Sequence, residues 1–191
     1  MIVWEFRYIT KNDIFDNTFP HWSRKYEYPT VMNYLFEIYD NKESPIKVHN
    51  TSMGFDVDHH IRFKNMLESY FGERNVVSSD LQPRYLPNTC VYDITSYPDA
   101  TFHEAFDCVL NISALEEIPG DHGQHLLNLY ANLKVGGYLI ITFDLPGFQL
   151  ERVEEFLGKK MATDEYDSRI IGHGGPWFDG LNVGLLIIQK D

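Results

Sequence analysis

Residues 106–142 constrain the fold more than any other stretch of this 191-residue chain. Residues 108–112 form a short apolar run, which is typical of a strand covered on both faces. Residues 126–133 then carry leucines at helical spacing, and the glycines at 136–137 predict the end of that helix. Residues 138–142 are β-rich and predict a return to the sheet. A strand–helix–strand unit of this kind predicts a parallel sheet, which binds ligands beyond the carboxyl ends of its strands.

The rest of the chain alternates in the same way. Apolar periodicity predicts helices at 31–39, 63–71 and 150–157, and short apolar runs predict strands at 46–48, 76–80, 89–92, 169–171 and 181–189. Pro29 and Thr30 predict the start of the first helix, whereas residues 1–29 show no clear period. The pattern predicts an α/β three-layer sandwich with a seven-stranded, mostly parallel sheet. Its last strand is expected to be antiparallel, because no helix pattern precedes it.

Length and charge narrow the class of protein further. A chain of 191 residues with 43% apolar residues fits one domain over residues 1–191, with 1–45 as an N-terminal arm and helix. The formal net charge of −12 disfavours a nucleic acid or an anionic membrane as partner. Without a signal-peptide pattern, and with Cys90 and Cys108 in apolar runs, we expect a cytoplasmic protein with reduced thiols. The oligomeric state is left open.

Polar residues gather where the predicted strands end. Two aspartates, Asp80 and Asp93, follow the second and third core strands. A carboxylate has two acceptor oxygens, so Asp80 suits a pair of ribose hydroxyls and Asp93 an adenine amino group. For both, the alternative is a strand-end cap or turn residue. Asn111 ends the next strand and is expected either to bind the ligand or to stabilise a loop.

Four motifs in chain order resemble one enzyme family. They are VVSSD, CVYDIT, FDCVLNISALEEI and LKVGGYLIIT, and together they resemble the class I S-adenosylmethionine-dependent methyltransferases over residues 46–191. The resemblance implies S-adenosylmethionine as cofactor and methyl transfer to a small molecule or sugar. It also implies that Asn50, Ser52, Gly54, Asp80, Asp93 and Asn111 bind the cofactor.

The first motif of that family is altered here. The family has a glycine-rich loop after its first strand, whereas this chain has VHNTSMGFD and retains Gly54 alone. Glycines in this loop let the backbone approach the cofactor closely. A catalytically inactive methyltransferase-like binding or assembly module is therefore the alternative to an active enzyme. A nicotinamide-dependent oxidoreductase is disfavoured, because the chain lacks a GxGxxG turn.

No catalytic residue is assigned from the sequence. His59 and His60 are candidates for a general base or for a plain surface position. His122 and His125 are spaced to share a metal, but no third ligand accompanies them, and no metal site is predicted. Arg24 and Glu27 are expected either to fold over the cofactor, with Glu27 near its ammonium group, or to pack as an N-terminal arm. His173 is a candidate lid residue, and Trp22, Tyr26 and Tyr28 are candidates for lining a substrate pocket.

Overall fold

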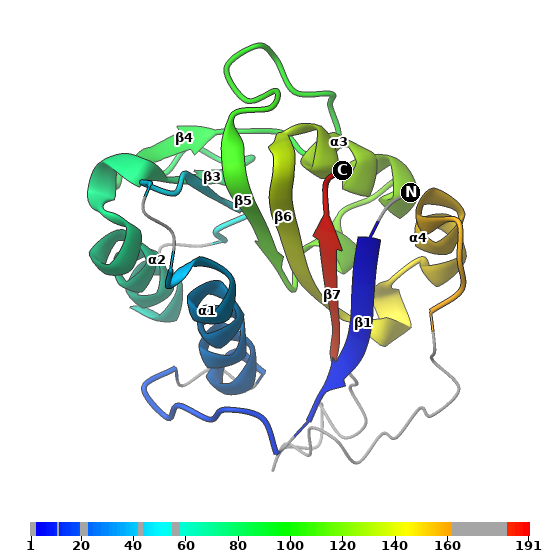
Figure 1. The fold of residues 1–191 in the computed structure, drawn as a ribbon, viewed down its shortest axis with the longest axis horizontal. Helices are drawn as coiled ribbons and strands as arrows, with labels where there is room; N and C mark the ends of the chain where they lie inside the picture. Colours follow the sequence, from blue (N-terminus) through cyan, green and yellow to red (C-terminus); the bar gives the residue numbers. More distant parts are fainter. Residues whose placement is uncertain (1–2, 11, 20–22, 42–43, 55–57, 162–182) are drawn as a thin grey trace.

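Seven strands in the described part of the chain form a single sheet (Figure 1). The computed structural model describes residues 3–10, 12–19, 23–41, 44–54, 58–161 and 183–191. The strands are β1 (Val3–Ile9), β2 (Val48–Thr51), β3 (Val76–Asp80), β4 (Thr89–Val91), β5 (Phe106–Ile112), β6 (Leu133–Asp144) and β7 (Val183–Gln189). They lie in the order β1-β7-β6-β5-β2-β3-β4.

The strand directions agree with the predicted fold class. β2 pairs in parallel with β3 and β5, and β4 and β6 continue the parallel arrangement outward. β7 pairs antiparallel with β6 on one side and with β1 on the other. The mostly parallel sheet with an antiparallel last strand is confirmed.

An N-terminal strand that the sequence pattern did not indicate completes the sheet. β1 pairs with β7 from Val3 opposite Gln189 to Ile9 opposite Val183. As an edge strand it is half-buried, so its aromatic residues alternate with polar ones instead of forming an apolar run. Residues 1–29 show no clear period in the sequence, so this strand was not predicted. The strand predicted at 169–171 lies outside the described residues.

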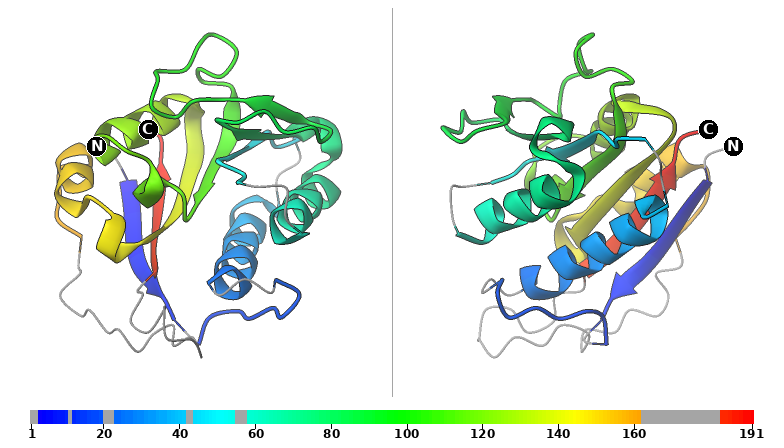
Figure 2. Two further views of the ribbon diagram at one scale, coloured as in Figure 1. Left: turned by 180° about the vertical axis from the view of Figure 1, so that it is seen from behind. Right: turned by 60° about the vertical axis from the view of Figure 1, so that its left-hand side comes forward.

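Helices cover both faces of the sheet (Figure 2). They are α1 (Arg24–Tyr39), α2 (Asp58–Phe71), α3 (His122–Ala131) and α4 (Leu150–Leu157), and the short 3-10 turns are η1 (Glu73–Asn75), η2 (Leu115–Glu117) and η3 (Leu145–Gly147). The apolar faces of α1 and α2 share one hydrophobic cluster with β2, β5 and β7, while α3 and α4 share a second cluster on the opposite face. This is the predicted three-layer arrangement.

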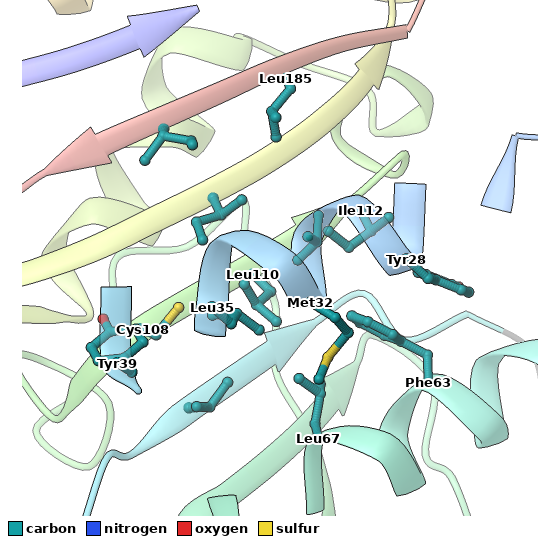
Figure 3. Packing of buried hydrophobic residues seen from close by; sticks show 14 of the residues in the cluster. Tyr28, Met32, Leu35, Tyr39, Phe63, Leu67, Cys108, Leu110, Ile112 and Leu185 are labelled. Carbon is teal, nitrogen blue, oxygen red and sulfur yellow. The ribbon is translucent and has the colours of Figure 1, made fainter. Parts of the chain in front are cut away.

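The layer of α1 and α2 brings the beginnings of these two helices together. Tyr28 of α1 stacks on Phe63 of α2, with ring centroids 4.1 Å apart (Figure 3). Leu35 and Leu67 are fully buried behind this ring pair. The two helices therefore form a packed wall at the side of the sheet where β2 and β5 end.

Helix α1 begins earlier than predicted. It starts at Arg24, which places Pro29 inside the helix instead of at its start. Proline has no N–H to donate to the carbonyl four residues back. Here the backbone N–H of Asp16 donates to the Lys25 carbonyl at 2.9 Å and satisfies it. Tertiary contact thus compensates for the proline and lets the helix extend to Arg24.

The crossover helix ends earlier than predicted. α3 stops at Ala131, and the glycines at 136–137 lie within β6. Gly136 donates its N–H to the Lys190 carbonyl, and Lys190 donates its N–H to the Gly137 carbonyl. These hydrogen bonds with Lys190 place residues 136–137 in a strand, although the helical spacing of the leucines continues to Leu133. By contrast, the helix predicted at 150–157 ends as expected, and Gly158 follows it with a left-handed φ of 68°.

Two further observations concern the class of protein. No helix among the described residues is long and apolar enough to cross a membrane. Cys90 and Cys108 are both free thiols; Cys108 is buried, whereas Cys90 is partly exposed.

Candidate functional site

The carboxyl ends of β2 to β5 enclose a cleft of about 450 Å³. β2 and β5 are neighbours in the sheet, with β3 and β4 continuing on one side and β6 on the other. Ligands of α/β sheets bind at such a reversal of strand order. The beginnings of α1 and α2 close the cleft through Arg24, Tyr28, His60 and Phe63. The fold thus forms a pocket where the sequence predicted one.

The structure brings most of the predicted cofactor residues together. Five of the six line the cleft: Asn50, Ser52, Gly54, Asp80 and Asp93. Asn111 is fully buried beneath them, and its amide donates to Thr51 Oγ1 at 3.0 Å and to Ser52 Oγ at 3.2 Å. Its position matches the loop-stabilising interpretation.

Neighbouring strands hold the altered first loop. β2 runs from Val48 to Thr51, later than the predicted 46–48, so Asn50 belongs to the strand, and its amide donates to Ser78 Oγ at 3.3 Å. Beyond the strand, the Met53 N–H donates to the Ser79 carbonyl at 2.8 Å. Ser52 has a φ of 51°, a left-handed conformation that is strained for a side chain with a Cβ. Hydrogen bonds to β3 thus hold this loop in a backbone conformation that glycine residues would adopt without strain.

The one glycine retained in this loop accommodates a histidine ring. Gly54 has a φ of 80°, and a Cβ placed on it would lie 2.4 Å from His60 Cε1. The imidazole of His60 therefore lies directly against the loop backbone and forms part of the cleft wall. His60 is thus a wall residue of the cleft and not an isolated surface residue.

Asp80 ties three parts of the site together. Its Oδ2 accepts the Gly54 N–H at 2.8 Å. Its Oδ1 accepts the Gln82 N–H at 3.0 Å and Arg84 Nη2 at 2.9 Å. The carboxylate is therefore ionically paired and held in one orientation at the end of β3.

Asp93 lies at the end of β4 in a compact turn. Its Oδ1 accepts the Thr95 N–H at 2.9 Å and the Thr95 hydroxyl at 2.7 Å. These hydrogen bonds lower the pKa of Asp93, because they favour the charged form. The carboxylate thus stays ionised while it faces the cleft.

A buried ion pair joins α1 to the ends of β5 and β6. Glu27 is fully buried and accepts hydrogen bonds from Arg24 Nη1, the Ser113 hydroxyl and, at 2.5 Å, the Thr142 hydroxyl. Burial alone would raise the pKa of Glu27, but Arg24 and the hydroxyl donors outweigh it and lower the pKa. Arg24 also donates to the Ser113 carbonyl at 3.2 Å and lines the cleft. Glu27 therefore fixes the Arg24 guanidinium at the cleft wall.

Two further carboxyl groups lie beside this ion pair. Glu116 Oε1 accepts the Asp144 N–H at 3.0 Å, while Glu116 Oε2 and Asp144 Oδ1 are buried without a hydrogen-bond partner. Burial raises the pKa of Glu116 to about 8, and burial with the nearby Glu27 charge raises that of Asp144 to about 7. In the sequence, Glu116 and Glu117 suggest a solvated or helix-leading pair of acids, but the Glu116 carboxyl is buried and is not solvated. Glu117, its neighbour, is exposed and lines the cleft.

His122 on α3 has a structural role. His122 Nδ1 accepts the Gln149 N–H at 3.1 Å, and His122 Nε2 contacts the Ile118 carbonyl at 3.2 Å. Among the residues with described placement, no three His, Cys, Asp or Glu side chains are grouped as a metal site.

His173 and Trp22 lie outside the described residues. Tyr26 packs against Phe15, with ring centroids 5.1 Å apart.

Several lining residues were not predicted as part of the site. Leu81, Tyr92 and Ile94 form apolar parts of the cleft wall, yet they lie at or beyond strand ends where no periodicity applies. Thr142 joins the Glu27 network from a strand 115 residues away. The spacing of Arg24 and Glu27 was the signal available for the ion pair, since residues three apart share one helix face.

Known proteins resemble this chain in structure. No protein-family model and no curated protein sequence matches it. The CMeT domain of the citrinin polyketide synthase has a TM-score of 0.56 and 14% identity, over 86% of this chain and 52% of that one. The TehB-like SAM-dependent methyltransferase of Corynebacterium glutamicum has a TM-score of 0.51 and 13% identity, over 81% of this chain and 86% of that one. The fold is that of the class I methyltransferases.

A third structure of the same fold is the trans-methyltransferase CalH in complex with SAH. It has a TM-score of 0.53 and 16% identity, over 88% of this chain and 57% of that one. The chain thus spans about half the length of the citrinin domain and of CalH. At such identities the likeness is one of fold, and the function must be argued from the site.

Proposed function

We propose that this chain binds S-adenosylmethionine in the cleft and transfers its methyl group to a small molecule or a sugar. The observation that carries the proposal is the meeting of Asp80, Asp93 and Arg24 in one cleft at the switch point of the sheet. The class I fold and the SAH complex of CalH support the choice of cofactor. The net charge of −12 supports a small acceptor over a nucleic acid.

The residues of the cleft fit an adenosyl group. A volume of about 450 Å³ lies within the range of small-molecule sites, and Leu81 and Ile94 supply apolar walls. Asp80 would accept hydrogen bonds from the ribose, and Asp93 from the adenine amino group. Arg24 lines the cleft, so its guanidinium would place a positive charge near the methionine carboxylate.

In methyl transfer the main task of the protein is to align the acceptor with the methyl group of the cofactor. The sulfonium of the bound cofactor supplies an activated methyl group, so catalysis rests on orienting the acceptor in line with it. The Glu27 network contributes to this by immobilising Arg24 and the end of β5 through Ser113. The hydrogen bonds on Asp93 contribute by keeping its carboxylate ionised.

Calorimetric titration with S-adenosylhomocysteine tests the proposal. Asp93→Asn retains an acceptor for the Thr95 N–H but removes the charge, so we expect about tenfold weaker binding. Asp99→Asn is the matched control, because Asp99 Oδ1 accepts the Thr101 N–H at 2.8 Å in the same kind of turn and does not line the cleft. The control is expected to bind like the unmodified protein.

Two outcomes would contradict the proposal. Equal losses in both variants would mean that Asp93 acts through the turn and not through the ligand. No binding of S-adenosylhomocysteine at millimolar concentration would favour the non-catalytic binding or assembly module. Transfer of a radiolabelled methyl group to a panel of small amines, alcohols and sugars then tests catalysis itself.

A further inference from the structure

The Asp80 carboxylate has nearly all of its hydrogen-bonding capacity in use. A carboxylate offers about four lone-pair positions, two on each oxygen. Oδ1 accepts two donors, the Gln82 N–H and Arg84 Nη2, and Oδ2 accepts one, the Gly54 N–H. One position, on Oδ2, is thus left for a ligand.

A ribose needs more than one position. Its two adjacent hydroxyls each carry a donor, and a carboxylate that binds both uses one oxygen for each. One of the two donors on Oδ1 must therefore leave before the diol binds both carboxylate oxygens. The Gln82 and Gly54 donors are backbone groups, and the Met53 N–H, which donates to the Ser79 carbonyl, holds the Gly54 loop in place. The Arg84 donor is the side-chain contact of the three, and a side chain rotates without moving the backbone.

Arg84 is well placed for such competition. The segment that carries it is tied to the start of β4, because the Thr89 hydroxyl shares its proton between the Leu86 carbonyl at 2.6 Å and the Arg84 carbonyl at 2.9 Å. The side chains of Arg84 and Asp80 are 11% and 12% exposed, so water screens their attraction little. Arg84 itself is not among the residues that line the cleft, whereas Asp80 is. The guanidinium therefore holds Asp80 from the side of the β3–β4 connection, away from the ligand space.

We propose that Arg84 competes with one ribose hydroxyl of the nucleoside for Asp80 Oδ1, so that this ion pair sets the affinity and ribose selectivity of the cleft. The inference rests on the proposed adenosyl-binding function. In the unmodified protein the nucleoside makes one hydroxyl contact with Asp80, or displaces Arg84 at a cost in affinity. Removal of the guanidinium leaves one acceptor position on each carboxylate oxygen for the diol.

Binding of three nucleosides to Arg84→Met tests this. Methionine keeps the length of the side chain and removes its donors. We expect S-adenosylhomocysteine and 5′-methylthioadenosine to bind about tenfold more tightly to this variant. The loss of affinity for 2′-deoxy-5′-methylthioadenosine, relative to the ribose form, is expected to be larger in the variant than in the unmodified protein.

The controls separate this effect from general damage. Arg152→Gln removes an exposed arginine from α4 that pairs with Glu155 at 3.1 Å, and it is expected to leave binding unchanged. Arg84→Leu, which also has no side-chain donor, serves as a second variant if Arg84→Met unfolds, as judged by circular dichroism.

The failures are distinguishable. Unchanged or weaker ribonucleoside binding in a folded Arg84 variant, with an unchanged 2′-deoxy effect, overturns the competition while leaving adenosyl binding intact. No binding of any nucleoside to the unmodified protein or the variants overturns the proposed function, and this inference with it.

Discussion

Replacement of Glu116 by glutamine should change how stability depends on pH. The Glu116 carboxyl has one oxygen buried without a partner, and the nearby cation, Arg24, is already paired with Glu27. Burial raises its pKa from 4.5 to about 8, so the folded protein holds a proton on Glu116 that the unfolded chain releases. Between these two values the folded state binds more protons, and its stability therefore falls as the pH rises.

The size of the effect follows from the same difference. The pKa of Glu116 differs between the unfolded and folded states by the interval from 4.5 to about 8. As the pH rises through this interval, the free energy of unfolding can fall by at most about 5 kcal/mol. Relaxation and water entry reduce such values, since buried sites behave as if their effective dielectric constant were about 20. We therefore expect roughly 2 kcal/mol from Glu116 itself.

Urea unfolding of the Glu116→Gln variant, measured from about pH 5 to about pH 9, checks this. The variant should lose less stability over the interval than the unmodified protein, by about 2 kcal/mol, and should be relatively more stable at the alkaline end. Glu117→Gln is the matched control, because Glu117 is the exposed neighbour of Glu116. Parallel stability curves for Glu116→Gln and the unmodified protein would refute the reasoning.

Two further substitutions address the cleft wall. Glu27→Gln leaves the Arg24 guanidinium buried without its counter-ion, so we expect a loss of about 3 kcal/mol in the free energy of unfolding, measured in urea; a loss below about 1 kcal/mol would contradict a buried, ionised pair. Gly54→Ala should cost about 1 to 2 kcal/mol for its left-handed φ and also weaken S-adenosylhomocysteine binding, because the new Cβ displaces His60. Gly158→Ala has a similar φ with no atom within 4 Å of the added Cβ, so it should lose stability alone; equal binding by both variants would argue against a role for the Gly54–His60 contact.

The parts of the fold that could be predicted from sequence are those set by local patterns. The apolar stripe of residues 63–71 gave α2, and Gly72 ends it with a φ of 88°. The end of α3 could not be predicted, because residues 136–137 pair with Lys190 at the far end of the chain. β1 was not predicted, because a half-buried edge strand has no continuous apolar run.

The same division applies to the candidate site. Asp80 and Asp93 were predictable as cleft residues, because the carboxyl ends of parallel strands meet at one edge of the sheet. The partners of Glu27 were not, since Ser113 and Thr142 approach it through tertiary packing alone. The burial of Glu116 could not be predicted either, because a Glu–Glu pair after a strand is typical of a solvated or helix-leading segment.

The pairing of β1 with β7 has a consequence for how the protein is made. β1 is the first of the described strands to leave the ribosome, and its partner, residues 183–189, is the last. β7 lies between β1 and β6 in the sheet. Neither β1 nor the outer side of β6 therefore has its partner strand until residue 189 has been translated. Contacts so distant in sequence form slowly, and until they form β6 presents an unpaired edge. The antiparallel end of the sheet is therefore where we expect the nascent chain to depend most on chaperones.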